Sequence, residues 1–232
     1  MGKKIAYLTV DDSPSKLMKE KVDYLLSKSI PAVFFCRGDF LEKRMKDVVY
    51  AIKNGFIVGN HAYSHKRFSE LNLKDIKIEI TKTDAFIEKA YKKAGIERTI
   101  KCFRFPYGNS GGKNKEKIQK FLETKGYKKQ ILRGITYDWW DEFDNRVDTY
   151  WTFDIREYEI HREKFSEINS IKDVFNHLKD KSPKRGGSLI ASDSAEVILI
   201  HDHEETHKIF KKLIDRLTEM EIEFRLPESS PL

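Results

Sequence analysis

The chain has 232 residues, 39% hydrophobic, 12% aromatic and 35% charged, which is enough apolar surface for a substantial folded core. This composition excludes an intrinsically disordered chain, and no apolar run is long enough to cross a bilayer as a helix. Lys and Arg outnumber Asp and Glu by 44 to 37, but the charges are interleaved along helical stretches, and no nucleic-acid-binding motif accompanies them. We therefore expect a folded protein with no nucleic-acid partner and no transmembrane segment.

The N-terminus passes directly from Met1-Gly2-Lys3-Lys4 into an apolar run. It lacks the long hydrophobic stretch and small-residue cleavage site of a secretory signal. This start predicts a cytoplasmic protein, or an extracytoplasmic one if a signal has been trimmed off. Without a linker or an internal repeat, residues 1–232 are expected to form a single domain.

Apolar runs rich in strand-forming residues alternate with stretches in which apolar residues recur three and four apart. The helical stretches end near Gly55, Gly95 and Gly126, residues suited to a helix C-terminus. Such alternation predicts a parallel sheet covered by helices, either open or closed into a barrel. The predicted strands are residues 4–10, 31–36, 56–59, 100–103, 130–137, 196–201 and 221–226.

The stretch from about residue 140 to 195 breaks this rhythm. It is first rich in aromatic residues and then polar, with a plausible helix around 171–179 and a loop over 182–187. Loops this long within a compact domain are usually functional lids or insertions. We therefore expect an insertion or lid at about 140–195.

Acidic, imidazole and guanidinium side chains recur where the predicted strands end. Singly, each has an ordinary structural reading as a turn former, helix cap, surface histidine or salt bridge. The C-terminal ends of parallel strands meet at one edge, so five such ends together favour a shared site. The segments are Asp11-Asp12, His61 to His65, Arg104 to Gly108, Asp138-Trp139-Trp140 and His201-Asp202-His203.

The chemistry that these residues permit is metal-assisted hydrolysis. His61 and His65 would face the same side if a helical turn began at His61, and Asp12 would complete a set of three ligands. Catalytic zinc sites have this layout, with positions left for water and substrate. Asp11 alternates with Asp12 along an extended strand, so it is free to act as general base unless the strand end is distorted.

The combination of motifs resembles the polysaccharide deacetylase superfamily, carbohydrate esterase family 4, in family order from residue 5 to about 225. The sequence departs from the usual motifs at Val10 (usually Phe), Ser13 (usually Gly), Ala62 (usually Ser or Thr) and Ile135 (usually an acid, three residues before Asp138). The motifs are Thr9-Val10-Asp11-Asp12-Ser13-Pro14, His61-Ala62-Tyr63-Ser64-His65, Arg104-Phe105-Pro106-Tyr107-Gly108, Tyr137-Asp138-Trp139 and Leu199-Ile200-His201.

The resemblance implies a distorted (β/α)7 barrel with parallel strands that hydrolyses an N-acetyl, or sometimes O-acetyl, group on a sugar. It also implies a divalent metal ion, most commonly Zn²⁺, with Co²⁺, Ni²⁺ or Mn²⁺ as alternatives. The resemblance implies that Asp12, His61 and His65 are the metal ligands and that Asp11 is the catalytic base, held charged and oriented by Arg104. It implies that His201 is the general acid, kept charged by Asp138, and that the Tyr107 N–H donates to the oxyanion. Trp139 and Leu199 are implied to line the pocket for the acetyl methyl.

The expected substrate is an N-acetylated glycan or a lipid-linked amino sugar. Two other functions stay open, a metal-dependent phosphoesterase and a non-catalytic carbohydrate-binding domain. Phosphoesterases often use two ions, whereas only three strong ligands are recognised here. A non-catalytic domain would be expected to lack the base or a ligand, and none is lost. His203 and His207 are expected at the surface.

Overall fold

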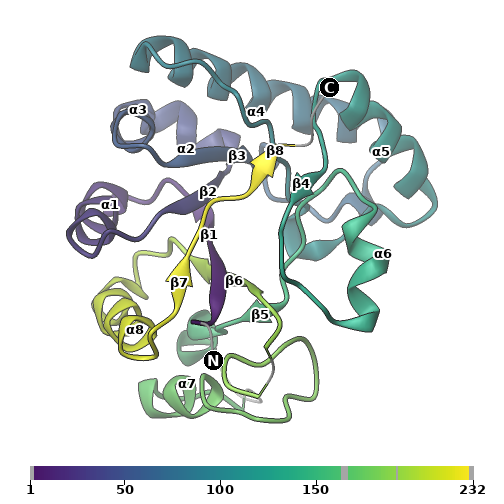
Figure 1. The fold of residues 1–232 in the computed structure, drawn as a ribbon. Helices are drawn as coiled ribbons and strands as arrows, with labels where there is room; N and C mark the ends of the chain where they lie inside the picture. Colours follow the sequence, from purple (N-terminus) through teal and green to yellow (C-terminus); the bar gives the residue numbers. More distant parts are fainter. Residues whose placement is uncertain (1–2, 163–166, 192, 230–232) are drawn as a thin grey trace.

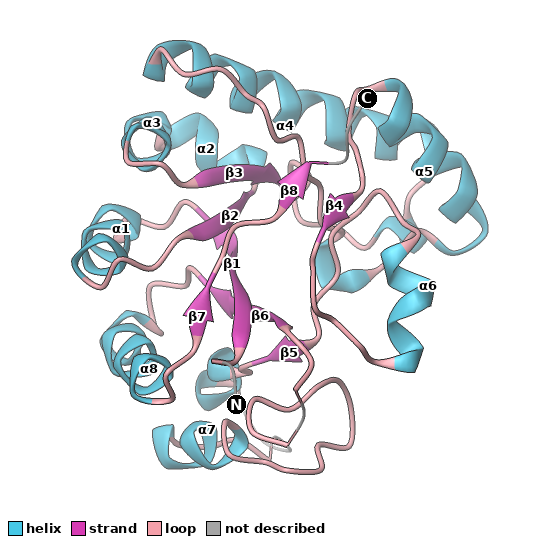
Figure 2. Ribbon diagram, viewed as in Figure 1, coloured by secondary structure: helices cyan, strands magenta, loops and turns pink. Residues whose placement is uncertain are grey.

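The computed structural model describes residues 3–162, 167–191 and 193–229 (Figures 1 and 2). Its strands are β1 (Ile5–Ser13), β2 (Ala32–Cys36), β3 (Ile57–Asn60), β4 (Gln130–Ile131), β5 (Phe153–Asp154), β6 (Glu196–His201), β7 (Glu223–Phe224) and β8 (Glu228–Ser229). Its α-helices are α1 (Met18–Ser27), α2 (Gly38–Lys43), α3 (Met45–Lys53), α4 (Leu73–Ala94), α5 (Lys115–Thr124), α6 (Asp141–Asp144), α7 (Ile171–His177) and α8 (His207–Glu219).

The strand β1 lies at the centre of a parallel sheet with the order β3-β2-β1-β6-β5. The short strand β7 pairs with the first residues of β1, before the stretch that pairs with β2. Every pairing in this sheet is parallel, so the C-terminal ends of its strands lie at the same edge.

Backbone hydrogen bonds close this sheet into a distorted barrel. Phe103 forms a parallel bridge with Asn60 at the end of β3, and the Thr149 N–H donates to the Phe103 carbonyl at 2.7 Å. Three residues later, the Thr152 N–H donates to Val197 of β6 at 3.0 Å. The connection therefore runs from β3 through these segments back to β6, and the predicted parallel barrel is confirmed.

The strand predicted over residues 130–137 is wrong in extent and in place. Only Gln130–Ile131 forms a strand there, and it pairs antiparallel with β8 outside the main sheet. The strand next to β6 is instead β5, within the stretch expected to be an insertion. The 140–195 stretch therefore supplies part of the barrel itself. With only two residues, β5 is too short to show a periodic pattern.

The helices surround the strands on the outside of the barrel (Figure 1). The largest core joins strand residues such as Leu8 and Ile200 to Val22 of α1 and Leu213 of α8. Among the predicted helices, α4 shows its end signals clearly. The Asn72 side chain accepts from the Asp75 N–H at its start, and Gly95 follows its end with a φ of 71°. No helix in the described ranges combines the length and apolar composition needed to cross a bilayer.

Candidate metal and catalytic site

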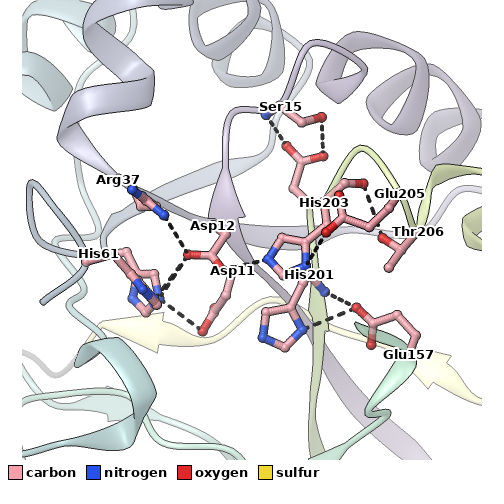
Figure 3. A network of polar contacts seen from close by, with 12 residues as sticks. Asp11, Asp12, Ser15, Arg37, His61, Glu157, His201, His203, Glu205 and Thr206 are labelled. Atoms are coloured by element: carbon pink, nitrogen blue, oxygen red, sulfur yellow. Dashed lines mark hydrogen bonds and ion pairs between the residues drawn. The ribbon is translucent and has the colours of Figure 1, made fainter. Parts of the chain in front are cut away.

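Side chains from several strand ends meet at the C-terminal edge of the barrel (Figure 3). Asp11 and Asp12 lie near the end of β1, His61 follows β3, and His201 ends β6. In the β1–β6 pairing, Asp11 and His201 are direct register partners. The sheet therefore places an acid and an imidazole from opposite ends of the chain side by side.

Asp12, His61 and His65 form a cluster with the chemistry of a cation site. Their candidate ligand atoms all lie within 4.8 Å of one another. Asp12 Oδ1 lies 3.1 Å from His65 Nε2 and 3.9 Å from His61 Nε2. This oxygen is buried and receives no hydrogen bond from a described residue. A buried carboxylate oxygen without a donor is costly, and one carboxylate with two imidazoles suits a divalent ion such as Zn²⁺.

The three residues converge because the backbone is bent at Asp12 and along residues 61–65. Asp12 has a φ of 60° where the β1–β2 register shifts, so the strand end is distorted and strict alternation with Asp11 is lost. The helical turn predicted from His61 is absent. Residues 61–65 form a bend in which Ala62 and His65 have φ values of 61° and 56°. Glu79 of α4 holds the bend by accepting from the Tyr63 and Ser64 N–H groups.

A hydrogen bond orients the His61 imidazole, and burial keeps the His65 imidazole neutral. His61 Nδ1 donates to the Arg104 carbonyl at 2.9 Å, which leaves the lone pair on Nε2, the nitrogen nearest Asp12. Burial, together with the neighbouring His61, lowers the pKa of His65 to about 4. Burial alone would raise the pKa of Asp12, but the hydrogen bond with His203 and the nearby histidines lower it well below its usual value.

Asp11 lies beside this cluster and is held by a buried arginine. Arg104 Nη1 donates to Asp11 Oδ1 at 2.8 Å and to the Thr9 hydroxyl at 2.7 Å. Its Nε donates to the Thr149 carbonyl at 3.0 Å, so the guanidinium is fixed from several sides. The other Asp11 oxygen lies 3.5 Å from His61 Nε2. The direction of the Asp11 side chain is thus fixed at the edge of the metal cluster.

The turn after Arg104 presents a free backbone donor. Tyr107 has a φ of 58°, and its N–H has no acceptor among the described residues. Tyr107 is 51% exposed, and its ring centroid lies 4.5 Å from that of His65. The N–H expected to serve as an oxyanion donor is therefore unpaired, on a residue whose ring contacts a candidate ligand.

The carboxylate partner of His201 is Glu157, so the predicted pairing with Asp138 is wrong. His201 Nδ1 lies 3.2 Å from Glu157 Oε1, which also accepts from the His201 N–H at 2.6 Å. Burial opposes charge on His201, but Glu157 and Asp154 outweigh it and raise the pKa of His201 to about 9. Burial raises the pKa of Asp154 to about 6. Asp138 is exposed, and its side chain makes no hydrogen bond or ion pair with any described residue.

Trp139 also lies elsewhere than predicted. The aromatic ring against His201 is Tyr158, at a centroid distance of 4.6 Å, whereas Trp139 is 39% exposed on the wall of a groove. Leu199 is buried in β6, and it alternates along the strand so that it shares a face with His201. Its register partner on β1 is Thr9, which receives a hydrogen bond from Arg104.

The segment that carries the carboxylate partner of His201 has a recognisable residue spacing in the sequence. Asp154-Ile155-Arg156-Glu157-Tyr158 has an acid, a second acid three residues later and then an aromatic residue. This is the arrangement that Ile135 breaks in the segment ending at Asp138-Trp139. Glu157 stands where the family motif has Asp and Tyr158 where it has Trp, so the Asp138-Trp139 segment was chosen instead.

His203 is a second missed residue, since it was expected at the surface. Its Nε2 lies 2.8 Å from Asp12 Oδ2 (Figure 3), whereas Asp12 Oδ1 is the oxygen near His61 and His65. The adjacent Asp202 is buried and fixes this loop. It accepts from the Ser15 N–H at 2.7 Å and pairs with the buried Lys21 at 2.6 Å. His203 thus orients the Asp12 carboxylate, the candidate ligand, through its second oxygen.

Comparison with known proteins gives a family match over the first part of the chain. The model of the polysaccharide deacetylase family matches residues 1–128, which contain Asp11, Asp12, His61, His65 and Arg104. A chitooligosaccharide deacetylase from Sinorhizobium fredii is 28% identical over 108 residues, covering 46% of this chain and 48% of that protein. A peptidoglycan-N-acetylglucosamine deacetylase from Bacillus cereus is 32% identical over 102 residues, covering 44% of this chain and 35% of that protein. The chain thus spans half or less of the length of these relatives.

A solved structure extends the likeness in fold to the whole chain. The family 4 carbohydrate esterase from Streptomyces lividans, in complex with acetate, superposes with a TM-score of 0.64 at 18% identity. The match covers 99% of this chain and 98% of that chain. The barrel, including β5 and β6, is therefore shared beyond the residues that the family match covers.

Proposed function

This chain belongs to the polysaccharide deacetylase family, and from that premise we propose that it is a metal-dependent hydrolase that removes N-acetyl, or O-acetyl, groups from a carbohydrate. The observation that carries the proposal is the convergence of Asp12, His61 and His65 within 4.8 Å, around a buried Asp12 oxygen that lacks a donor. The substrate class is an N-acetylated glycan or a lipid-linked amino sugar.

Asp12, His61 and His65 would hold the ion, which is Zn²⁺ in the preferred assignment. When bound, a divalent ion supplies a water of lowered pKa and a positive charge for the acetyl carbonyl. The neutral state of His65 and the available lone pair on His61 Nε2 support this ligand set. His203 keeps Asp12 oriented by its contact with the second carboxylate oxygen.

Asp11 acts as the general base that takes a proton from the attacking water. Its ion pair with Arg104 at 2.8 Å fixes the direction of the carboxylate. Attack on the amide places negative charge on the carbonyl oxygen, and the unpaired Tyr107 N–H is available to donate to it. A base fixed in position contributes about 10²–10⁴-fold to such a reaction.

His201 acts as the general acid that protonates the leaving amine, so that the C–N bond breaks to give acetate and a free amine. Glu157 keeps its imidazole charged near neutral pH, in the role predicted for Asp138. Leu199, on the same face of β6, lines the space for the acetyl methyl together with Tyr158, which takes the place predicted for Trp139.

The proposal is tested by measuring acetate release from N-acetylated chitooligosaccharides before and after treatment with a chelator. Release that stops with the chelator and returns with added Zn²⁺ supports it. Hydrolysis of a phosphate ester without acetate release would instead identify a phosphoesterase. Glycan binding without any turnover would identify a non-catalytic binding domain.

A further inference from the structure

We propose that Asp154, Glu157 and His201 form a second zinc site, and that an ion bound there disables the general acid. Only the inhibition rests on the proposed function, in which His201 is that acid. The three residues offer one ligand atom each, and these atoms all lie within 4.8 Å of one another. Zinc accepts both carboxylate and imidazole ligands, and the imidazole favours Zn²⁺ over Mg²⁺ or Ca²⁺.

One oxygen of this cluster is buried without a hydrogen-bond donor. Among the described residues, only two carboxylate oxygens are in this state, Asp12 Oδ1 and Glu157 Oε2. Glu157 is 1% exposed and its carboxylate lies against His201 (Figure 3), so bulk water does not supply the missing donor. Asp12 and Glu157 belong to different clusters, the two in the described chain whose ligand atoms converge. The feature that marks the first metal cluster is therefore repeated in the second.

Backbone N–H groups fix both carboxylates of the second cluster and leave one oxygen of each available. The His201 N–H donates to Glu157 Oε1 at 2.6 Å, and the Arg156 N–H donates to Asp154 Oδ1 at 2.9 Å. The nearest described donor to Asp154 Oδ2 is the Tyr158 hydroxyl, at 3.5 Å, which is a weak contact. Contacts of this kind to the outer atoms orient metal ligands in proteins.

Negative charge exceeds positive charge within the second cluster. Asp154 and Glu157 share a single cation, His201, because the Arg156 guanidinium is paired with Glu159 at 2.8 Å. Burial raises the pKa of Asp154 to about 6, and the charge of Glu157 adds to this rise while His201 opposes it. The two carboxylates therefore repel each other, and a divalent ion between them would relieve that repulsion more fully than the one positive charge on His201.

An ion can reach the second cluster from solvent. Asp154 and Tyr158 line the groove that Trp139 borders, and this groove has a volume of about 810 Å³. Asp154 and His201 are half-buried, whereas Glu157 is buried. The cluster is therefore open to a hydrated ion at Asp154, and a new metal site needs such an entry path.

An ion at this site would remove the acid that the reaction uses. The nitrogen that faces Glu157 is His201 Nδ1, at 3.2 Å. An ion bound to Nδ1 takes its lone pair, so the proton held there passes to solvent and the imidazole loses its positive charge. A neutral imidazole is a much weaker acid, and the leaving amine then stays unprotonated.

The second ion is not a partner of the first in catalysis. Two-metal hydrolases hold their ions about 3.5–4 Å apart as one clamp on the reacting group. The two clusters here share no residue, so no described side chain bridges them. They should also fill in order. Burial lowers the pKa of His65 to about 4, so the first cluster has a neutral imidazole ready, whereas His201 holds a proton that the ion must displace.

The test titrates zinc into chelator-treated protein by calorimetry, which reports binding whether or not the enzyme turns over. The wild type should show two events and bind about two ions per chain. Asp154→Asn should keep the first event and lose the second. His65→Ala should lose the first event and keep the second. Asp138→Asn changes an exposed carboxyl outside both clusters and should keep both events.

Activity measured along the same titration tests the inhibition. Acetate release by the wild type should rise as the first event saturates. It should then fall about 10²–10⁴-fold as the second saturates, which is the usual contribution of a general acid. In Asp154→Asn, the release that remains should not fall over the same zinc range. Two binding events in the wild type without a fall in release would overturn the inhibitory role of the second ion.

The binding data decide about the site separately from the proposed function. A single event in the wild type, absent from His65→Ala, overturns the second site and leaves the proposed function standing. A second event that persists in Asp154→Asn also overturns it, because the ion then binds elsewhere. If Asp154→Asn loses the first event as well, its fold has failed, and His201→Ala decides in the same way. If the wild type releases no acetate at any zinc concentration, the proposed function fails, while loss of the second event in Asp154→Asn still supports the site.

Discussion

Asp11 and His201 are direct partners in the parallel pairing of β1 with β6, and the Asp202 N–H donates to the Asp11 carbonyl at 2.8 Å just beyond them. Register partners on neighbouring parallel strands point to the same face of the sheet. The pairing therefore brings the proposed base and the proposed acid to one place without any loop to position them. Each is then held by a different partner, Arg104 for Asp11 and Glu157 for His201.

Asp11→Asn should lower kcat about 10²–10⁴-fold, because the amide cannot accept a proton from the attacking water. Its zinc content should stay near that of the wild type, since the proposed ligands are untouched. Metal analysis of the purified variant beside its acetate-release rate checks both parts. Loss of zinc from Asp11→Asn would show that Asp11 is a ligand, and full activity would remove it as the base.

Glu157→Gln should shift the alkaline limb of the pH profile of kcat/KM to lower pH by about one unit or more. In the wild type, the pKa of His201 is raised to about 9, so the acid form persists until the pH rises through that value. The same raised pKa stabilises the fold most below about pH 6.5, and this contribution disappears as the pH rises through about 9.

The matched control is Asp138→Asn, which changes the exposed carboxyl first expected to support His201. Its alkaline limb should coincide with that of the wild type. A shift in Asp138→Asn together with an unmoved limb in Glu157→Gln would reverse the assignment that the geometry favours.

His203→Ala should weaken zinc binding about 10- to 100-fold, the usual effect of removing a side chain that orients a metal ligand. The loss should appear in the dissociation constant measured by competition with a chelating dye, whether or not the enzyme turns over. His207→Ala provides the control, because its imidazole contacts Glu20 rather than Asp12. Equal affinity in the two variants would contradict a role for His203 at the metal.

Lys21→Met should destabilise the fold by about 3–5 kcal/mol, because it leaves the buried Asp202 carboxylate without its cation. Lys19→Met removes the exposed pair with Asp23 on the same helix and should cost less than about 1 kcal/mol. Urea unfolding of the two variants measures the difference. Similar midpoints for both would show that the Lys21–Asp202 pair contributes no more than a surface pair.

The sequence was sufficient to predict which residues meet at the site where their positions follow from local signals. Asp11 and Asp12 lie at the end of β1, His61 and His65 come after β3, and Arg104 follows the residue that bridges to β3, and parallel strands deliver such residues to one edge. The bend over residues 61–65 was not predictable in the same way. It depends on Glu79, which lies in α4 and is brought there by the tertiary fold.

The partner of His201 was missed for a related reason. Residues 130–137 have the composition of a strand, whereas β5 is only two residues long and owes its pairing to β6. A strand defined by its neighbours leaves little pattern in its own sequence. We therefore predicted for Asp138 and Trp139 the roles beside His201 that we now propose for Glu157 and Tyr158.

The account depends most directly on where one metal ion binds. We would measure anomalous scattering at the zinc edge from crystals grown with Zn²⁺. The predicted result is one strong peak about 2.0–2.2 Å from Asp12 Oδ1, His61 Nε2 and His65 Nε2, with Asp11 outside the ligand set. A peak bound by Asp11 in place of Asp12, or no peak at these three residues, would contradict the proposed chemistry.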